Sequence, residues 1–355
     1  MAVVLIDGFD VYNGTSANTG LQAKWSAAVT LNSAGIAQSM AAGRFGGQCF
    51  RATPNAGSNN VGQTTRALPG SYSSIALGFA VRCGAVASLY SGGLPTILQL
   101  IEGSTYHLHL TMQNDGKLSV YRASSATAGT LLGTTSSAVI LTSTWHYIEV
   151  EAVIHDTTGS VKVYVDGAQV LNLTGQDTRN GGSGVIDKIG LLGNGNSSSC
   201  TMDFDDLYIV DTATKLGERR VETIYPTSDV AQGFARSTGS ANYSLVDEAQ
   251  VNGDTDYVQG SSVGDVDTYG FGDLASTPSA ISAIQVTAFA EKTDATTRQF
   301  AMQIKSGGTP SDGSNNLLLT SYAKFERIVE TDPNTSAAWT ASGVNALQGG
   351  PKVTV

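Results

Sequence analysis

The segment Trp145-His-Tyr-Ile-Glu-Val-Glu-Ala-Val-Ile154, followed by Ser160-Val-Lys-Val-Tyr-Val-Asp-Gly167, decides the fold class of this chain. In both segments apolar residues recur at every second position, which is the pattern of a strand with one buried and one exposed face. Asp166 and Gly167 end the second segment, and these residue types tolerate the positive φ angles of a tight hairpin turn. The stretch therefore predicts two antiparallel strands, with a hairpin turn after the second.

The same alternation continues on both sides of this stretch. Residues 74–82, 105–112 and 117–121 alternate between apolar and polar positions, and turn sequences such as Asn114-Asp-Gly116 separate them. Strands at this spacing predict an antiparallel β-sandwich. We expect only short helical pieces, such as residues 33–42 and 341–347.

The composition excludes several classes of protein. Only 14% of the 355 residues are charged, compared with about 25% in a typical soluble domain. The net charge of −10 argues against a sequence-independent grip on nucleic acid and against binding to anionic membrane surfaces. No apolar run approaches the ~18 residues of a membrane span. The charges are missing mainly from strand faces, so we expect part of the apparent surface to be covered by other subunits.

The chain divides into two predicted domains. The polar residues 212–218 interrupt the alternation, and a second β-rich segment follows them. We predict an all-β protein with a first domain at residues 1–214 and a second, smaller β-sandwich at residues 215–355. Each part is long enough to bury a core of its own.

The cysteines and the N-terminus bear on the cellular compartment. Cys49, Cys83 and Cys200 cannot all pair within one chain, and each lies in or beside an apolar-alternating run. We therefore predict reduced thiols in the core. The first seven residues lack the basic region of a signal peptide, so we expect synthesis in a reducing cytoplasm.

The deciding stretch resembles the centre of concanavalin A-like and laminin G-like sandwiches, in which a Trp opens one strand and the next ends in a Tyr-Val-Asp-Gly turn. Residues 186–192 and 202–211 resemble the last strands of that fold, and Leu5-Ile-Asp-Gly-Phe-Asp10 resembles its N-terminal strand. The resemblance covers residues 1–211 and implies a sandwich with Trp145 as a core anchor. It says little about function, because the fold hosts lectins, glycosidases, adhesion modules and structural proteins.

The C-terminus resembles the ending of many tailed-bacteriophage virion proteins. The resemblance rests on the turn sequence of residues 330–339, which ends in Trp339, on a short helix at residues 340–347, and on the last residues 352–355. Thr340 or Ser342 can cap the helix. Gly349-Gly-Pro351 departs from the family pattern in the expected last strand.

The pair Glu149 and Glu151 is the candidate for acid–base chemistry. Residues two apart in a strand share a face, about 6–7 Å from each other, and retaining glycosidases need carboxyl groups about 5–5.5 Å apart. Glycosidases on concanavalin A-like sandwiches carry a third acid in this run, and here it is absent. We therefore expect a solvated strand face that contacts sugar or protein at most.

Metal sites are the next candidates. His107 and His109 share a predicted strand face, but a zinc site needs a third ligand, so we expect an exposed polar face. Asp203, Asp205 and Asp206 could hold calcium with loop carbonyls, as the laminin G-like resemblance implies. Since the ligand set of that family cannot be matched here, we predict neither a metal nor another cofactor.

Tyrosines form the remaining candidate surface, because sugar-binding loops use tyrosine for stacking and hydrogen bonding. Tyr72, Tyr90, Tyr106 and Tyr121 fall near predicted turns or strand ends. The predicted ligand-binding residues are Tyr106, Tyr121, Glu149 and Glu151.

The phage resemblance implies a non-enzymatic structural protein of the virion, made in the host cytoplasm. We expect a tail fibre, a tail tip or another surface appendage that contacts host glycan or neighbouring virion proteins, as a homotrimer. A capsid decoration protein or head fibre is the alternative, and a glycan-cleaving enzyme that uses Glu149 and Glu151 is a distant one.

Overall fold

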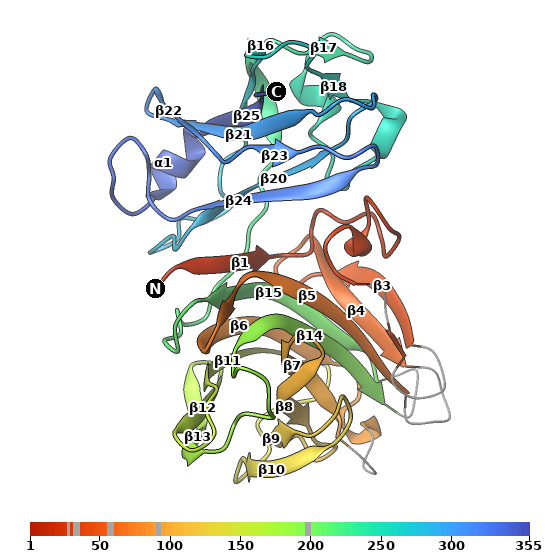
Figure 1. Ribbon diagram of the computed structural model, residues 1–355, viewed down its shortest axis with the longest axis vertical. Coiled ribbons are helices and arrows are strands. Elements are labelled where there is room, and N and C mark those ends of the chain that lie inside the picture. The colour runs from red at the N-terminus through yellow and green to blue at the C-terminus, as the bar shows by residue number, and fades with distance from the viewer. Residues whose placement is uncertain (27–28, 31–35, 55–59, 90–93, 196–199) are drawn as a thin grey trace. The chain divides into compact units, whose positions relative to one another are not determined.

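Figure 1 shows the computed structural model of the chain, in which residues 1–26, 29–30, 36–54, 60–89, 94–195 and 200–355 are described. The chain forms two compact units. The first contains residues 1–9 and 25–221, and the second contains residues 10–24 and 222–355. The sequence-based boundary lies at residues 214 and 215, whereas the structure leaves residues 215–221 with the first unit and gives residues 10–24 to the second.

The first unit contains two antiparallel sheets, sheet A and sheet B. Sheet A has the strand order β13 (Ala168–Gln176), β12 (Gly159–Val165), β11 (Trp145–Val153), β6 (Ser74–Cys83), β15 (Met202–Val210), β4 (Gln48–Pro54) and β3 (Ile36–Ala42), and β1 (Val3–Asp7) pairs with β15. Sheet B has the order β10 (Gly129–Thr134), β9 (Leu118–Ala123), β8 (Thr105–Met112), β7 (Thr96–Glu102), β14 (Ile186–Gly195), β5 (Asn60–Tyr72) and β2 (Val29–Thr30). The 3₁₀-helix η2 (Val86–Ser88) follows β6.

The two sheets face each other across one apolar core. Leu100 and Leu110 of sheet B and Val150 and Val161 of sheet A line the same small cavity. Because side chains alternate along a strand, the neighbours of these residues point away from the core. This arrangement confirms the predicted all-β class and the antiparallel sandwich.

The predicted hairpin turn is confirmed, since Asp166 and Gly167 have φ angles of 49° and 82°. The prediction of Trp145 as the core anchor is wrong. Trp145 is half-buried, and Cζ of Arg82 lies 4.6 Å from the centre of its ring. The buried tryptophan of the first unit is Trp25, whose indole N–H donates to Asp7 at 2.9 Å.

The predicted helix at residues 33–42 is also wrong where it is described. Residues 33–35 lie outside the described residues, and Ile36–Ala42 forms β3. All seven residues of β3 pair with β4. Tertiary pairing of this kind routinely overrides local helix propensity.

The second unit is also built from antiparallel strands. Its largest sheet has the order β16 (Pro226–Gln232), β19 (Asp267–Phe271), β25 (Gln348–Val353), β21 (Gln299–Ser306) and β22 (Thr309–Asp312), and β23 (Asn316–Leu317) pairs with β21. Two smaller sheets pair β20 (Ile284–Ala290) with β24 (Ala323–Val329) and β17 (Ala235–Arg236) with β18 (Val258–Gln259). The helices are η1 (Leu21–Ala23), η3 (Tyr243–Leu245), η4 (Gly253–Thr255) and α1 (Ala341–Asn345).

The C-terminal segment completes the core of the second unit. Trp339, Val344 and Leu347 pack with Ile304 of β21, and side chains of β20 and β24 cover this cluster. The predicted cap of α1 is confirmed, because the Thr340 hydroxyl accepts from the Gly343 N–H at 3.0 Å.

Gly349-Gly-Pro351, which departs from the phage-protein pattern, still forms part of a last strand, β25. β25 lies between β19 and β21. Position 350 requires glycine because the backbone of β19 passes close to it. A Cβ atom there would lie 2.2 Å from the carbonyl oxygen of Asp267. Among the described residues, no helix is long and apolar enough to cross a bilayer.

Candidate functional site

Glu149 and Glu151 lie on the face of sheet A that points away from sheet B, but they are not solvated. Glu149 is 0% exposed and Glu151 is 8% exposed. The Tyr208 hydroxyl donates to Oε1 of Glu149 at 2.7 Å, and Nζ of Lys215 lies 2.7 Å from Oε2. The expectation of a solvated strand face is therefore wrong.

Glu151 is held in the same way. Its Oε2 accepts from Nζ of Lys162 at 3.0 Å and from the Tyr164 hydroxyl at 3.3 Å. Its Oε1 accepts from the backbone N–H of Lys215 at 3.1 Å. All four oxygens of the two carboxylates thus have a donor, and two ammonium groups balance two negative charges.

The cover over this face is the segment of residues 212–221, which we call the strap. The Leu216 N–H donates to the Tyr208 hydroxyl at 2.9 Å, and the Val221 N–H donates to Oδ1 of Asp206 at 2.8 Å. Burial raises the pKa of Tyr208 most, and the hydrogen bond to Glu149 raises it further. The phenol therefore stays protonated and keeps Glu149 in place rather than acting as an acid.

The outer face of sheet B carries a second polar group of residues, which we call the amide–tyrosine row: Tyr106, Gln63, Gln99, His109 and Tyr121. The Tyr106 hydroxyl donates to Oε1 of Gln63 at 3.5 Å. The Gln63 amide donates to Oε1 of Gln99, and Nε2 of Gln99 lies 3.3 Å from Nε2 of His109. Tyr121 pairs directly with His109 across the neighbouring strand. The row joins β5, β7, β8 and β9.

Gly190 of β14 makes this row possible. β14 lies between β5 and β7, so a side chain here would separate the two glutamines. A Cβ atom on Gly190 would lie 3.1 Å from both Nε2 of Gln63 and Oε1 of Gln99. The glycine therefore lets the two amides meet over the middle strand.

His109 is a neutral imidazole with one N–H left over. Nε2 of Gln99 also donates to the carbonyl of Ala126 at 2.8 Å, which fixes the amide as a donor toward Nε2 of His109. The proton of His109 then sits on Nδ1, and this buried atom has no hydrogen-bond partner in the described part of the chain. Burial lowers the pKa of His109 to about 4.

His107 does not share this face, although the sequence predicts that it does. The register between β7 and β8 shifts between Leu100 and Ile101, so His107 is the extra residue of a β-bulge. Its Nε2 lies 3.0 Å from Glu102, and its Nδ1 accepts from the Asn180 N–H at 3.2 Å. Both histidines are 0% exposed, which contradicts the expected exposed polar face.

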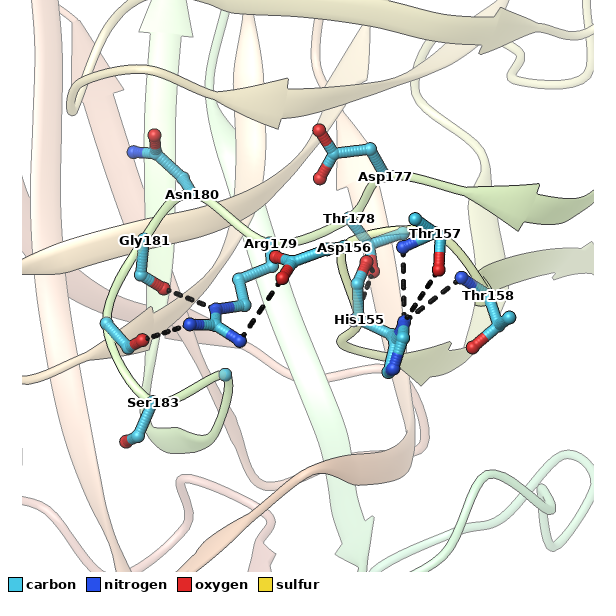
Figure 2. A network of polar contacts seen from close by, with 12 residues as sticks. His155, Asp156, Thr157, Thr158, Asp177, Thr178, Arg179, Asn180, Gly181 and Ser183 are labelled. Atoms are coloured by element: carbon cyan, nitrogen blue, oxygen red, sulfur yellow. Dashed lines mark hydrogen bonds and ion pairs between the residues drawn. The ribbon is translucent and has the colours of Figure 1, made fainter.

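The loop that reaches His107 is fixed by its own polar contacts, which Figure 2 shows. Arg179 donates to the carbonyl oxygens of Gly181 and Gly182 and lies 3.4 Å from Asp156. The amide of Asn180 in this loop donates to the Tyr106 carbonyl at 3.1 Å. The loop therefore positions the backbone at one end of the amide–tyrosine row.

The candidate calcium ligands are engaged by protein groups. Asp203 is bound by Arg51 and Arg82, with distances of 2.6–2.9 Å. Asp205 accepts from the backbone N–H groups of Arg44 and Asp206. No group of three or more metal-ligating side chains occurs among the described residues.

The structure thus separates the four predicted ligand-binding residues. Tyr106 and Tyr121 lie beside His109, whereas Glu149 and Glu151 lie on the other sheet under the strap. Tyr72 is half-buried in β5, and Tyr90 lies outside the described residues. Gln63 and Gln99 are not among the residues predicted from the sequence, although Gln99 is a lone amide in the apolar run of β7.

No protein-family model matches this chain, and no curated protein matches it. Solved structures do resemble it. Alginate lyase Aly36B is 13% identical, with a TM-score of 0.40 over 62% of this chain and 98% of that chain. The botulinum neurotoxin type G receptor binding domain is 13% identical, with a TM-score of 0.33 over 57% of this chain and 44% of that chain. The metal-free carbohydrate recognition domain of Emp46p is 9% identical, with a TM-score of 0.36 over 59% of this chain and 99% of that chain. Likenesses of this size carry no argument about the function of this chain.

Proposed function

We propose that the first unit binds a neutral glycan through the amide–tyrosine row, and that the protein is a non-enzymatic structural component of a tailed-phage particle. The observation that carries the glycan part is the hydrogen-bonded chain from Tyr106 through Gln63 and Gln99 to His109. It places aromatic rings and neutral polar groups side by side on one face of a sheet.

The chemistry of the row fits a sugar. Tyr106 and Tyr121 are half-buried, so their rings are the part that a ligand can reach. Gln63, Gln99 and His109 are buried, and Gln63 and His109 contact Tyr106 and hold its ring in place. A sugar ring stacks on a tyrosine and exchanges hydrogen bonds with its hydroxyl. The row carries no formal charge when His109 is neutral, and a net charge of −10 repels acidic polysaccharides. These properties favour a neutral glycan.

Binding is favoured over cleavage by the state of the two glutamates. A glycosidase needs one carboxyl group as a proton donor and one as a nucleophile or base, with substrate between or beside them. Glu149 and Glu151 are buried, and Lys215 and Lys162 occupy their oxygens. This pair therefore supports a structural role.

The placement in a phage particle rests on the C-terminal resemblance and on the low charge. We propose a tail fibre, tail tip or similar appendage, built as a homotrimer with other virion proteins as neighbours. A capsid decoration protein or head fibre is the alternative. Low charge supports assembly in either place, because subunit interfaces are depleted in Lys, Glu and Asp.

A glycan array with the full chain tests the first part. We expect binding to neutral glycans, and we expect Tyr121→Ala to weaken it by about tenfold, which corresponds to about 1.4 kcal/mol. Tyr257→Ala is the matched control, because Tyr257 is exposed in the second unit. Silence across the array, or equal binding by all three proteins, would refute glycan binding by the row.

Imaging of phage particles that carry a label at Val355 tests the placement. A label on tail appendages supports the leading proposal, and a label on the head supports the decoration protein. A particle preparation that lacks the protein altogether would refute both placements, without bearing on glycan binding.

A further inference from the structure

The first unit contains two cysteines whose sulfur atoms touch. Sγ of Cys83 and Sγ of Cys200 lie 3.9 Å apart, although the residues are 117 positions apart in sequence. All three cysteines of the chain are buried and in the thiol form. Cys49 lies apart from this pair, and its thiol donates to the carbonyl of Ala42 at 3.3 Å.

The backbone holds the two thiols in this position. Cys83 ends β6, and its cross-strand partner in β15 is Met202. The Gly84 N–H donates to the Thr201 carbonyl at 2.8 Å, so the strand pairing continues past the ends of both strands. A disulfide has an S–S length of about 2.05 Å. The sulfur atoms must therefore approach by about 2 Å. Cys200 lies two residues before Met202, the direct partner of Cys83, so closing the bond requires movement at the strand ends.

We propose that Cys83 and Cys200 are a redox-active pair, which a low-molecular-weight disulfide such as oxidised glutathione converts into an intramolecular disulfide. The Cys83 thiolate attacks one sulfur of the reagent and releases one glutathione thiolate. Once Cys83 is in the mixed disulfide, its hydrogen bond and charge no longer raise the pKa of Cys200. The Cys200 thiol then loses its proton, attacks Cys83 and releases the second glutathione thiolate. Two protein thiols are oxidised, one glutathione disulfide is reduced to two glutathione molecules, and the two protons go to the released thiolates.

The assignment of Cys83 as the attacking group follows from its surroundings. The hydrogen bond between the two thiols lowers the pKa of Cys83 and raises the pKa of Cys200, so Cys83 is the first of the two to ionise. Burial and the nearby Asp203 and Asp205 raise the pKa of Cys49 to about 12, and its thiol contacts the Ala42 carbonyl rather than another sulfur atom, so Cys49 lies outside the pair. Since both thiols of the pair are buried, the first step proceeds through a local opening of the strand ends and is slow.

The consequence is a folded chain that becomes more stable after it leaves a reducing compartment. The bond would close a long loop that contains β7 to β14, which are most strands of sheet B and three strands of sheet A. Closing such a loop restricts the unfolded chain and stabilises the folded one. A protein that folds with reduced thiols would thus gain a covalent link in an oxidising environment, without any change in its fold.

The test uses the full chain, purified in reduced form and incubated with oxidised glutathione under native conditions. We expect the intact mass to fall by two hydrogen atoms, one thiol to react with an alkylating reagent after unfolding, and peptide mapping to link Cys83 to Cys200. We also expect the unfolding temperature to rise, and to return to its first value after reduction.

Three variants make the result specific. Cys49→Ala keeps the mass change and the rise in unfolding temperature, whereas Cys83→Ala and Cys200→Ala lose both. A wild-type protein that keeps three reactive thiols overturns the proposal. So does a stable glutathione adduct without an internal link, or a link that contains Cys49. The wild-type result decides even where a variant folds poorly.

Discussion

The ammonium nitrogen of Lys215 lies 2.7 Å from Oε2 of Glu149, a carboxylate that is completely buried on the outer face of sheet A. The same ammonium group lies 4.6 Å from the centre of the Tyr164 ring. The two charged residues are 66 positions apart, so this contact fixes the strap to a strand formed much earlier in the chain. The glutamate that the sequence suggests as a catalytic group is instead the anchor of the strap.

Substitution of Lys215 tests this relationship. Lys215→Met leaves the Glu149 carboxylate buried without its counter-charge, and we expect a loss of about 3 kcal/mol in the free energy of unfolding. Urea denaturation, followed by tryptophan fluorescence, measures it. Lys117→Met is the control, because Lys117 belongs to an exposed ion pair with Asp115 and such pairs contribute about 0–1 kcal/mol. Equal losses in the two variants would contradict the anchor role.

The strap also shows what the sequence could and could not predict. The alternation at residues 145–154 correctly predicts β11 and places Glu149 and Glu151 on its outer face. It cannot predict what covers that face, because the cover comes from residues 212–221, which have no periodic pattern. A charged residue on the polar side of a strand pattern is read as solvated unless a distant segment is known to pack on it.

Gly190→Ala tests the amide–tyrosine row without touching a polar group. Its methyl group would lie 3.1 Å from both glutamine side chains, so it would separate Gln63 from Gln99 and release His109 and Tyr106 from their positions. We expect glycan binding to fall by about tenfold, or about 1.4 kcal/mol, while the protein stays folded by circular dichroism. Gly272→Ala is the control, since a Cβ atom there has its first contact at 3.7 Å. Unchanged binding by Gly190→Ala would mean that the row does not hold the ligand.

The row was only half predictable. Tyrosines at strand ends suggest sugar contact, and Tyr106 and Tyr121 do lie together beside His109. Gln63 and Gln99 belong to no motif, and their contact depends on a glycine in the strand between them. The bulge at His107 is a single extra residue that appears only in the register of β7 and β8. Sequence periodicity predicts faces of strands, but it does not predict where a register shifts.

Titration of His109 gives a pH dependence of stability. Burial lowers its pKa from the ordinary 6.5 to about 4 in the folded chain. Between these values the unfolded chain binds a proton that the folded chain does not, so the free energy of unfolding falls as the pH drops through this range. We expect His109→Asn to flatten this part of the profile, measured by urea midpoints across the range. The exposed His155 offers the control His155→Asn, which should leave the slope of the unfolding free energy against pH as it is. An unchanged slope in His109→Asn would assign the pH dependence to other groups.

Glu102 controls stability at lower pH, and folding lowers its proton affinity as it does that of His109, so the two effects have the same sign. Burial acts to raise the pKa of this carboxyl group. The hydrogen bonds from Ser183, His107 and Gly184 outweigh that effect and hold the pKa at about 2, below the ordinary 4.5. The ionised carboxylate therefore stabilises the fold fully above pH 4.5, and this contribution is lost as the pH falls toward 2.

We expect Glu102→Gln to lower stability at neutral pH and to make the loss between pH 4.5 and 2 less steep, because an amide does not titrate. Urea midpoints across that range measure both effects. The control is Asp156→Asn, since Asp156 is 60% exposed in its ion pair with Arg179 and such pairs contribute little. If the acid slope of Glu102→Gln matched that of the wild type, the carboxylate would not be the group that ties the 180–185 loop to β7. The acid sensitivity would then have to come from other groups.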